Sequence, residues 1–237
     1  MFDAHIHLQD CKANLTTNKF GFWCNATSPD DWERVLSFSS VIRFIGIHPW
    51  FAEKINGDWE EKLRDILEKE NIGIGEIGLD KACKNVSFEK QMVIFDKQVC
   101  LALEYNVPFS VHCVRAFSYL FDVIIKKKIT VPYMIHSFCG DEQELETALM
   151  SGAYISISPR QVKAERMFNM IKKIPLEKLL IETDFPNVPR NFYGEKYSEI
   201  LQFMYERTAE IKKVDFEVLT DSVEKNGKIF TDRIIAG

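Results

Sequence analysis

The chain has 237 residues, with 46% hydrophobic and 27% charged side chains and a formal net charge of -5. This composition is typical of a globular protein with a buried core, and it excludes a disordered chain and a general basic surface for nucleic acid. No apolar run approaches the roughly 18 residues of a membrane span, and no secretory signal precedes the first strand-like segment. The six cysteines form no CxxC pair. We therefore expect a reduced, cytoplasmic protein.

The first strand-like segment, residues 2–8, carries His5 and His7 two positions apart. Successive side chains of a strand face opposite sides, so these two imidazoles point the same way, about 6.6 Å apart along the strand. They can therefore converge on one cation. Taken alone, a His-x-His pair is a weak signal, because two histidines can also occur near an N-terminus without a shared role.

Strand-like and helix-like segments then alternate along the chain. Further strands are expected at residues 20–26, 41–47, 72–80, 108–111, 132–135, 153–158 and 178–184. Helices are expected through Trp32, Val35 and Leu36 and at residues 59–69, 87–106, 117–127, 141–150 and 162–173. The first of these helices is expected to be capped by Ser28, with Pro29 at its first position. Eight such units predict a closed (β/α)8 TIM barrel of the α/β class, with a doubly wound open sheet as the alternative.

The last segment, residues 193–237, has helical periodicity and no histidine. We expect it to form C-terminal helices that pack on the barrel. No Pro/Gly/Ser-rich linker divides the sequence, and barrels of this kind commonly have this length. The chain is therefore predicted to be a single domain over residues 1–237.

The three remaining histidines, His48, His112 and His136, each follow an apolar strand-like run. A lone carboxylate, Glu76, lies inside the fourth strand, where burial is costly without a partner or a metal, and Asp184 ends the eighth. Since the active site of a (β/α)8 barrel forms at the carboxyl ends of its strands, we expect all of these side chains at one site.

Nitrogen and oxygen ligands in this mixture suit two divalent metal ions, with Zn, Mn and Mg as candidates. Such a pair activates water for hydrolysis, with a carboxylate as a bridge and another as a proton acceptor. Glu76 fits the first role and Asp184 the second. Cys113 and Cys139 lie close to histidines in the sequence and could supply thiolates, but free cysteines are commonly buried and we favour a structural role.

Several ordered motifs resemble those of TatD-type metal-dependent hydrolases. They are Asp3-Ala4-His5-Ile6-His7, Gly46-Ile47-His48-Pro49, Gly75-Glu76-Ile77-Gly78-Leu79-Asp80, Val111-His112-Cys113, Ile135-His136-Ser137-Phe138-Cys139-Gly140 and Leu180-Ile181-Glu182-Thr183-Asp184-Phe185-Pro186. The resemblance implies a TIM barrel of the metallo-dependent hydrolase superfamily, with deoxyribonuclease activity in some members. It also implies the metal ligands, namely His5, His7, Glu76 and Asp184 for one ion and Glu76, His112 and His136 for the other.

The chain departs from the family pattern at positions that face substrate. Val114 and Arg115 stand where the family often has Arg-Asp, Lys81 replaces a tyrosine or histidine, and Trp50 follows His-Pro. The metal ligands are retained, so that metal-dependent hydrolysis is better supported than the identity of the substrate.

Three residues are candidates for substrate contacts: His48, Arg115 and Arg190. The alternatives are a buried, hydrogen-bonded histidine and two ordinary surface arginines. These residues are expected to contact DNA or another phosphodiester, and nothing in the sequence indicates an obligate protein partner.

The leading hypothesis is a metal-dependent deoxyribonuclease that cleaves DNA phosphodiester bonds with a metal-activated water. One alternative is amidohydrolase-like hydrolysis of a small amide or ester; related barrels often carry a carbamylated lysine on the fourth strand, where this chain has Glu76. A second alternative is a non-catalytic barrel that keeps metal for stability. The presence of Asp184, the candidate proton acceptor, disfavours that alternative.

Overall fold

Eight parallel strands form the centre of the structure, and each pairs with the next one in the sequence. They are β1 (Phe2–Ile6), β2 (Gly21–Asn25), β3 (Ile42–Ile45), β4 (Gly73–Asp80), β5 (Phe109–Val114), β6 (Tyr133–Ile135), β7 (Tyr154–Ile157) and β8 (Leu179–Ile181). This computed structural model describes residues 1–11, 21–55, 57–192 and 194–235. Residue 20, where the second strand was expected to begin, lies outside these ranges.

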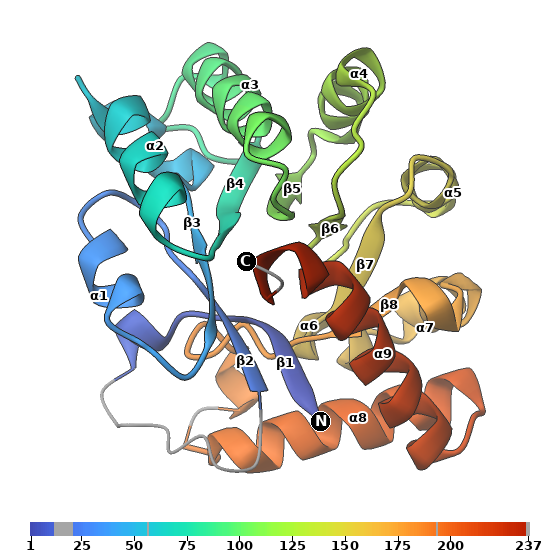
Figure 1. Ribbon diagram of the computed structural model, residues 1–237. Helices are drawn as coiled ribbons and strands as arrows, with labels where there is room; N and C mark the ends of the chain where they lie inside the picture. The colour runs from blue at the N-terminus through green and yellow to red at the C-terminus, as the bar shows by residue number, and fades with distance from the viewer. Residues whose placement is uncertain (12–20, 56, 193, 236–237) are drawn as a thin grey trace.

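The segment after β8 returns to β1 and nearly closes the ring. The backbone N–H of Asp184 donates to the carbonyl of His5 at 3.0 Å, and the N–H of His7 donates to the carbonyl of Phe185 at 2.8 Å. Helices surround the strands on the outside (Figure 1). The predicted (β/α)8 barrel is therefore confirmed, and the open-sheet alternative is wrong.

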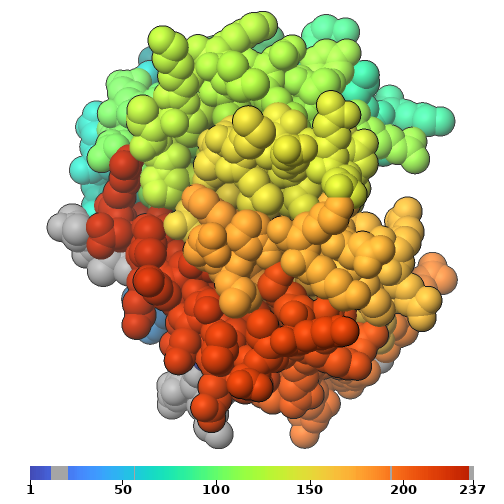
Figure 2. Space-filling model, turned by 90° about the vertical axis from the view of Figure 1, so that its right-hand side faces the viewer, coloured from blue at the N-terminus to red at the C-terminus, as the bar shows by residue number. Residues whose placement is uncertain are grey.

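The helices alternate with the strands, and in a side view α4, α5, α7 and α9 form consecutive bands over the barrel (Figure 2). The α-helices are α1 (Trp32–Leu36), α2 (Trp59–Lys69), α3 (Phe88–Glu104), α4 (Phe117–Lys127), α5 (Glu142–Met150), α6 (Pro159–Lys163), α7 (Glu165–Lys173), α8 (Tyr197–Lys212) and α9 (Phe216–Ile235). Short 3-10 turns are η1 (Leu8–Asp10), η2 (Pro49–Lys54), η3 (Leu176–Lys178) and η4 (Arg190–Phe192). None of the described helices is long and apolar enough to cross a lipid bilayer.

Two helix boundaries differ from those expected. The first helix begins at Trp32, and Ser28 does not cap it; instead the carboxylate of Asp31 accepts the backbone N–H groups of Thr27 and Ser28 and closes a turn before the helix. The single helix expected over residues 162–173 is divided into α6 and α7 at Ala164, whose backbone is extended.

The C-terminal helix α9 packs on the barrel, as predicted, and crosses the open end of the ring (Figure 1). Its Phe230 is fully buried and stacks on Trp23 of β2, with ring centroids 4.9 Å apart. The same ring contacts Phe44 of β3 and Tyr154 of β7. Tyr154 is the first residue of β7, and the side chain of Asn226 in α9 donates to the carbonyl of Leu179, the first residue of β8, at 2.9 Å. Helix α9 therefore covers the amino-terminal end of the barrel and leaves the carboxyl end for the functional site.

Candidate metal centre

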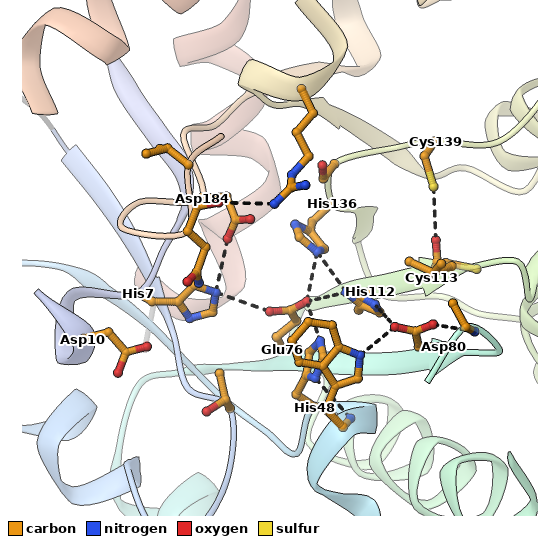
Figure 3. Close-up of a pocket in the computed structure, with 18 of the residues that line it drawn as sticks. His7, Asp10, His48, Glu76, Asp80, His112, Cys113, His136, Cys139 and Asp184 are labelled. Carbon is orange, nitrogen blue, oxygen red and sulfur yellow. Dashed lines mark hydrogen bonds and ion pairs between the residues drawn. The ribbon is translucent and has the colours of Figure 1, made fainter. Parts of the chain in front are cut away.

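Seven side chains that the sequence indicated gather at the carboxyl ends of the strands. They are His5 in β1, His7 just after it, His48 before η2, Glu76 in β4, His112 in β5, His136 after β6 and Asp184 after β8. A cavity of about 750 Å³ opens over this end of the barrel, and every one of the seven except the fully buried His5 lines it (Figure 3). The structure therefore brings together residues that are far apart in the sequence.

The Glu76 carboxylate lies at the centre of the cluster, and its Oε2 faces β1. His5 Nε2 is 3.2 Å from this oxygen and His7 Nε2 is 3.5 Å from it. His7 Nε2 also lies 3.4 Å from Oδ1 of Asp184. Two imidazoles and two carboxylates thus converge on one point.

The other carboxylate oxygen of Glu76, Oε1, faces β5 and β6. His136 Nε2 is 2.9 Å away and His112 Nδ1 is 3.0 Å away, and His48 Nε2 follows at 3.4 Å. Glu76 therefore lies between two groups of histidines, with one oxygen directed at each (Figure 3).

A glycine makes this arrangement possible. A Cβ atom at Gly78 would lie only 1.9 Å from the carbonyl oxygen of His112, and the φ of Gly78 is 148°. Only glycine adopts this backbone conformation without strain, and its missing side chain lets β4 lie against β5 beside the site. The glycine in the Gly-Glu-Ile-Gly motif is therefore required by the backbone.

The outer ring nitrogens of three histidines face hydrogen-bond acceptors. The acceptors are the carbonyl of Asn25 for His7 (2.9 Å), the carboxylate of Glu182 for His136 (3.2 Å) and that of Asp80 for His112 (3.3 Å). Each of these nitrogens must therefore carry the ring proton. Partners of this kind fix the tautomer and the orientation of metal-binding histidines.

It follows that the inner nitrogens of the neutral rings present lone pairs to one another and to Glu76. His112 Nδ1 and His136 Nε2 are 3.3 Å apart. His7 Nε2 lies 3.2 Å from Nε2 of His5, whose other nitrogen is 3.3 Å from the Ser110 hydroxyl. Facing lone pairs repel each other unless a proton or a cation lies between them. The donor set of imidazole nitrogens and carboxylate oxygens therefore fits a divalent metal ion.

His48 differs from these histidines because its ring proton is on the inner nitrogen. Its Nδ1 accepts the backbone N–H of Trp50 at 3.2 Å, so the ring proton is on Nε2, which faces Glu76. Burial lowers the pKa of His48 to about 4, so the ring is neutral at pH 7. In this arrangement His48 directs a hydrogen-bond donor at Glu76.

Charges are strongly coupled within the cluster. Although burial favours the neutral acid, the surrounding histidines hold the pKa of Glu76 well below its usual value. Burial likewise opposes ionisation of Asp184, but the bond to His7 lowers its pKa. For His7 itself, burial opposes the charged ring, yet Asp184 and Glu76 outweigh burial and raise its pKa to about 9. In the absence of metal, protonated histidine rings such as His7 therefore balance the negative charge of the ionised carboxylates.

Two buried carboxylates that support the site were not identified from the sequence. Glu182 holds His136, and its other oxygen accepts the hydroxyl of Ser156. Asp3 accepts the backbone N–H of Thr183 at 2.9 Å and the Tyr197 hydroxyl at 3.0 Å, and so ties β1 to the segment that carries Asp184. The available signal was a charged residue inside an apolar strand, which is costly to bury without partners.

The structure does not place Arg115 or Arg190 in the lining of the cavity. Both are exposed; Arg115 follows β5 and Arg190 lies in η4. Among the described lining residues, the one lysine or arginine is Arg160 at the start of α6, whose guanidinium donates to the carbonyl of Asn187 at 3.4 Å. The sequence contains no signal that distinguishes Arg160 from other arginines.

Cys113 and Cys139 also line the cavity (Figure 3). The Cys139 thiol lies 3.6 Å from the carbonyl of Cys113 and donates to it. Burial raises the pKa of the Cys113 thiol well above its ordinary value, so that it stays protonated. Within the described residues, every cluster able to hold a metal consists of histidines and carboxylates alone.

Comparison with known proteins identifies similar sequences and structures. The family described as TatD related DNase matches residues 2–231. The "Uncharacterized metal-dependent hydrolase YjjV" of Escherichia coli is 30% identical over 180 residues, which are 72% of this chain and 70% of YjjV. The "3'-5' ssDNA/RNA exonuclease TatD" of Pantoea ananatis is 30% identical over 194 residues, 77% of this chain and 75% of that protein.

Solved structures agree with these sequence matches. The crystal structure of Escherichia coli YjjV superposes with a TM-score of 0.82 at 25% identity, covering 89% of this chain and 85% of YjjV. A TatD family hydrolase from Entamoeba histolytica gives a TM-score of 0.82 at 19% identity, covering 97% of both chains. Because only 19% of residues are identical, the similarity to the Entamoeba histolytica structure shows the fold alone.

Proposed function

The chain belongs to the TatD-related DNase family of metal-dependent hydrolases, and on this premise we propose that it is a nuclease that cleaves the phosphodiester bonds of single-stranded DNA or RNA. The observation that carries the proposal is the position of Glu76 between two groups of imidazoles, with Asp184 at the edge of the same cavity. The name of the Pantoea ananatis relative supports the class of substrate.

Two sets of residues would hold the metal. One consists of His5, His7, Asp184 and Glu76, and the other of Glu76, His112 and His136. The inner nitrogens that face one another support this assignment, since cations would relieve the repulsion between them. When bound, divalent cations supply Lewis acidity, lower the pKa of water and stabilise negative charge on a phosphoryl group.

Asp184 is proposed to accept the proton of the attacking water. Its carboxylate is ionised because the bond to His7 lowers its pKa, and it lines the cavity. Asp80 and Glu182 orient His112 and His136 from outside, and they leave the inner nitrogens free of protons once metal is present. His48 supplies the Nε2 proton that can bond to a phosphoryl oxygen.

The charge distribution supports a short, single-stranded substrate. The chain has a net charge of -5, and the lining of the cavity in the described ranges contains a single guanidinium, that of Arg160. A duplex-binding surface would require several cationic groups along both backbones. Recognition would therefore be local, at the phosphate beside the metal centre.

The test is release of nucleotides from end-labelled single-stranded DNA and RNA with Mg, Mn or Zn added to metal-free protein. We expect activity that depends on metal and is abolished by Glu76→Gln. Glu177→Gln, which changes an exposed carboxylate after α7, is the matched control and should leave activity unchanged. Hydrolysis of an amide or ester panel, without cleavage of nucleic acid, would overturn the proposal in favour of the amidohydrolase alternative.

A further inference from the structure

Trp50 is an exposed aromatic side chain beside the candidate metal centre. Its exposed fraction is 55%, whereas the other three tryptophans, Trp23, Trp32 and Trp59, are buried at 3%, 3% and 8%. Trp50 lines the cavity from η2, two residues after His48. A large ring exposed at a cavity wall contributes little to core packing, and aromatic side chains in such a position are typical ligand contacts.

The indole is held firmly although it is exposed. Its Nε1–H donates to Oδ2 of Asp80 at 2.6 Å, and its backbone N–H donates to Nδ1 of His48 at 3.2 Å. Its centroid lies 4.9 Å from that of His48 and 6.1 Å from that of His112, at interplanar angles of 85° and 70°. These contacts are edgewise, so that no described ring stacks on the indole.

We propose that Trp50 is a stacking platform for the nucleobase next to the scissile phosphate, an inference that rests on the proposed nuclease function. Bases bind to aromatic faces in single-stranded complexes without regard to sequence, because every base has a π-face. The ring is already oriented by the hydrogen bond from its Nε1–H to Asp80, so little side-chain entropy is lost when a base stacks on it. The indole centroid is 6.1 Å from that of His112, which contacts Glu76. A base stacked on the indole would therefore lie next to a phosphate bound at the metal centre.

The position of Arg160 agrees with this arrangement. Trp50 follows β3 and Arg160 follows β7, and these strands are four positions apart in a sheet of eight. The two residues therefore approach the cavity from opposite sides of the barrel. A nucleotide whose base stacks on Trp50 would direct the rest of the strand past the centre, toward the guanidinium.

A variant-by-substrate comparison tests the stacking directly. The substrates are a short single strand and the same strand with an abasic residue next to the scissile bond. On the normal strand, Trp50→Leu should lower kcat/KM by about 5- to 150-fold, which is the effect of losing one stacked base. The wild-type protein should lose a similar factor on the abasic strand, and Trp50→Leu should lose nothing further there.

Two further variants separate stacking from support of Asp80. Trp50→Phe removes the indole N–H but keeps an aromatic face, so its loss should be much smaller than that of Trp50→Leu. Tyr119→Leu changes a half-exposed aromatic residue outside the cavity lining and should have no effect. Equal losses on the normal and abasic strands for Trp50→Leu would overturn the proposal, because they would indicate that the indole only braces Asp80 and His112.

Binding can also be measured without turnover. Because Trp50 is the exposed tryptophan, deoxyadenosine 5'-monophosphate with Mg should quench the fluorescence of the wild-type protein, and 2-deoxyribose 5-phosphate should not. Trp50→Phe should lose the response. If the wild-type protein cleaves nucleic acid but shows neither quenching nor discrimination against the abasic strand, stacking is wrong and the nuclease function stands. If it cleaves no nucleic acid, the nuclease function fails, and lack of quenching then overturns stacking independently.

Discussion

The Nε2 atom of His136 lies 2.9 Å from Oε1 of Glu76, while the other nitrogen of the same ring faces the buried carboxylate of Glu182 at 3.2 Å. The outer bond places the ring proton on Nδ1 and leaves a lone pair directed at a carboxylate. Such a pair is stable only with a cation or a proton in between. This relationship links the packing of the barrel to its proposed chemistry.

The first prediction concerns Glu182, which is fully buried. Glu182→Gln keeps the shape of the side chain but removes the charge that orients His136. We expect metal affinity to fall by about 10- to 100-fold, as is typical when such a supporting partner is lost. Isothermal titration with Mn or Zn measures the change, and circular dichroism establishes that the variant is folded. Unchanged affinity would show that the tautomer of His136 does not depend on Glu182.

The second prediction is that metal binding releases protons. Burial opposes charge on His7, His112 and His136, but the neighbouring carboxylates raise the pKa of each ring, that of His7 to about 9. At pH 7 the metal-free centre therefore holds protons that a cation must displace. Metal affinity should increase as the pH rises from about 6.5 to 9.

Titration in buffers of different ionisation enthalpy counts the released protons. The apparent binding enthalpy should vary with the buffer at pH 7 and vary less at pH 9, where His7 has lost much of its proton. An enthalpy that does not depend on the buffer at pH 7 would contradict the charge state inferred for the cluster.

The third prediction concerns the stability of the metal-free protein. Burial raises the pKa of Asp3 to about 7, against the opposing effect of the bonds from Thr183 and His5. A raised acid pKa means that the folded state binds the proton more tightly than the unfolded chain. The contribution of Asp3 to the free energy of unfolding is therefore fully present below about pH 4 and is lost as the pH rises to about 7.

Asp3→Asn isolates this effect because the amide does not titrate. The free energy of unfolding of the wild-type protein, minus that of the variant, should fall between about pH 4 and 7 in EDTA. Urea unfolding monitored by circular dichroism gives both values. A difference that stays constant over this range would show that Asp3 keeps an ordinary pKa.

The fourth prediction concerns Arg160. If its guanidinium contacts a phosphate, Arg160→Ala should weaken binding of single strands of any sequence and reduce the slope of log K against log salt by about 0.7. Fluorescence anisotropy at several salt concentrations measures both. Arg190→Ala is the matched control, since Arg190 is exposed and lies outside the cavity lining. Equal effects of the two substitutions would indicate a nonspecific charge effect.

The barrel and the positions of the histidines could be predicted because strand periodicity places them. His48, His112 and His136 each follow an apolar run, and parallel strands of a barrel all end on one face. Glu76 stood out because a lone carboxylate inside a buried strand requires a partner. Local sequence patterns are therefore sufficient to locate the strands and the histidines and carboxylate that they carry.

The carboxylate that supports His136, Glu182, and the loop residues that line the cavity, such as Arg160, could not be predicted in the same way. Whether Glu182 faces His136 depends on the register between β7, β8 and the segment after β6, which no local pattern determines. Which loop residues line the cavity depends on the path of each loop after its strand. Arg115, one residue past β5, is exposed outside the cavity lining, whereas Arg160 lies in the lining, near the start of α6, which follows β7 after one residue.

The central claim is that Glu76 is shared between cations held by the histidines around it. A crystal soaked in Mn and inorganic phosphate, with anomalous scattering recorded at the manganese edge, tests this most directly. We expect anomalous peaks about 2.0 to 2.3 Å from the Glu76 oxygens and from the inner nitrogens of His7 and His136, with phosphate in contact. Full occupancy of Mn at other sites, with Glu76 still in direct contact with the imidazoles, would contradict the claim.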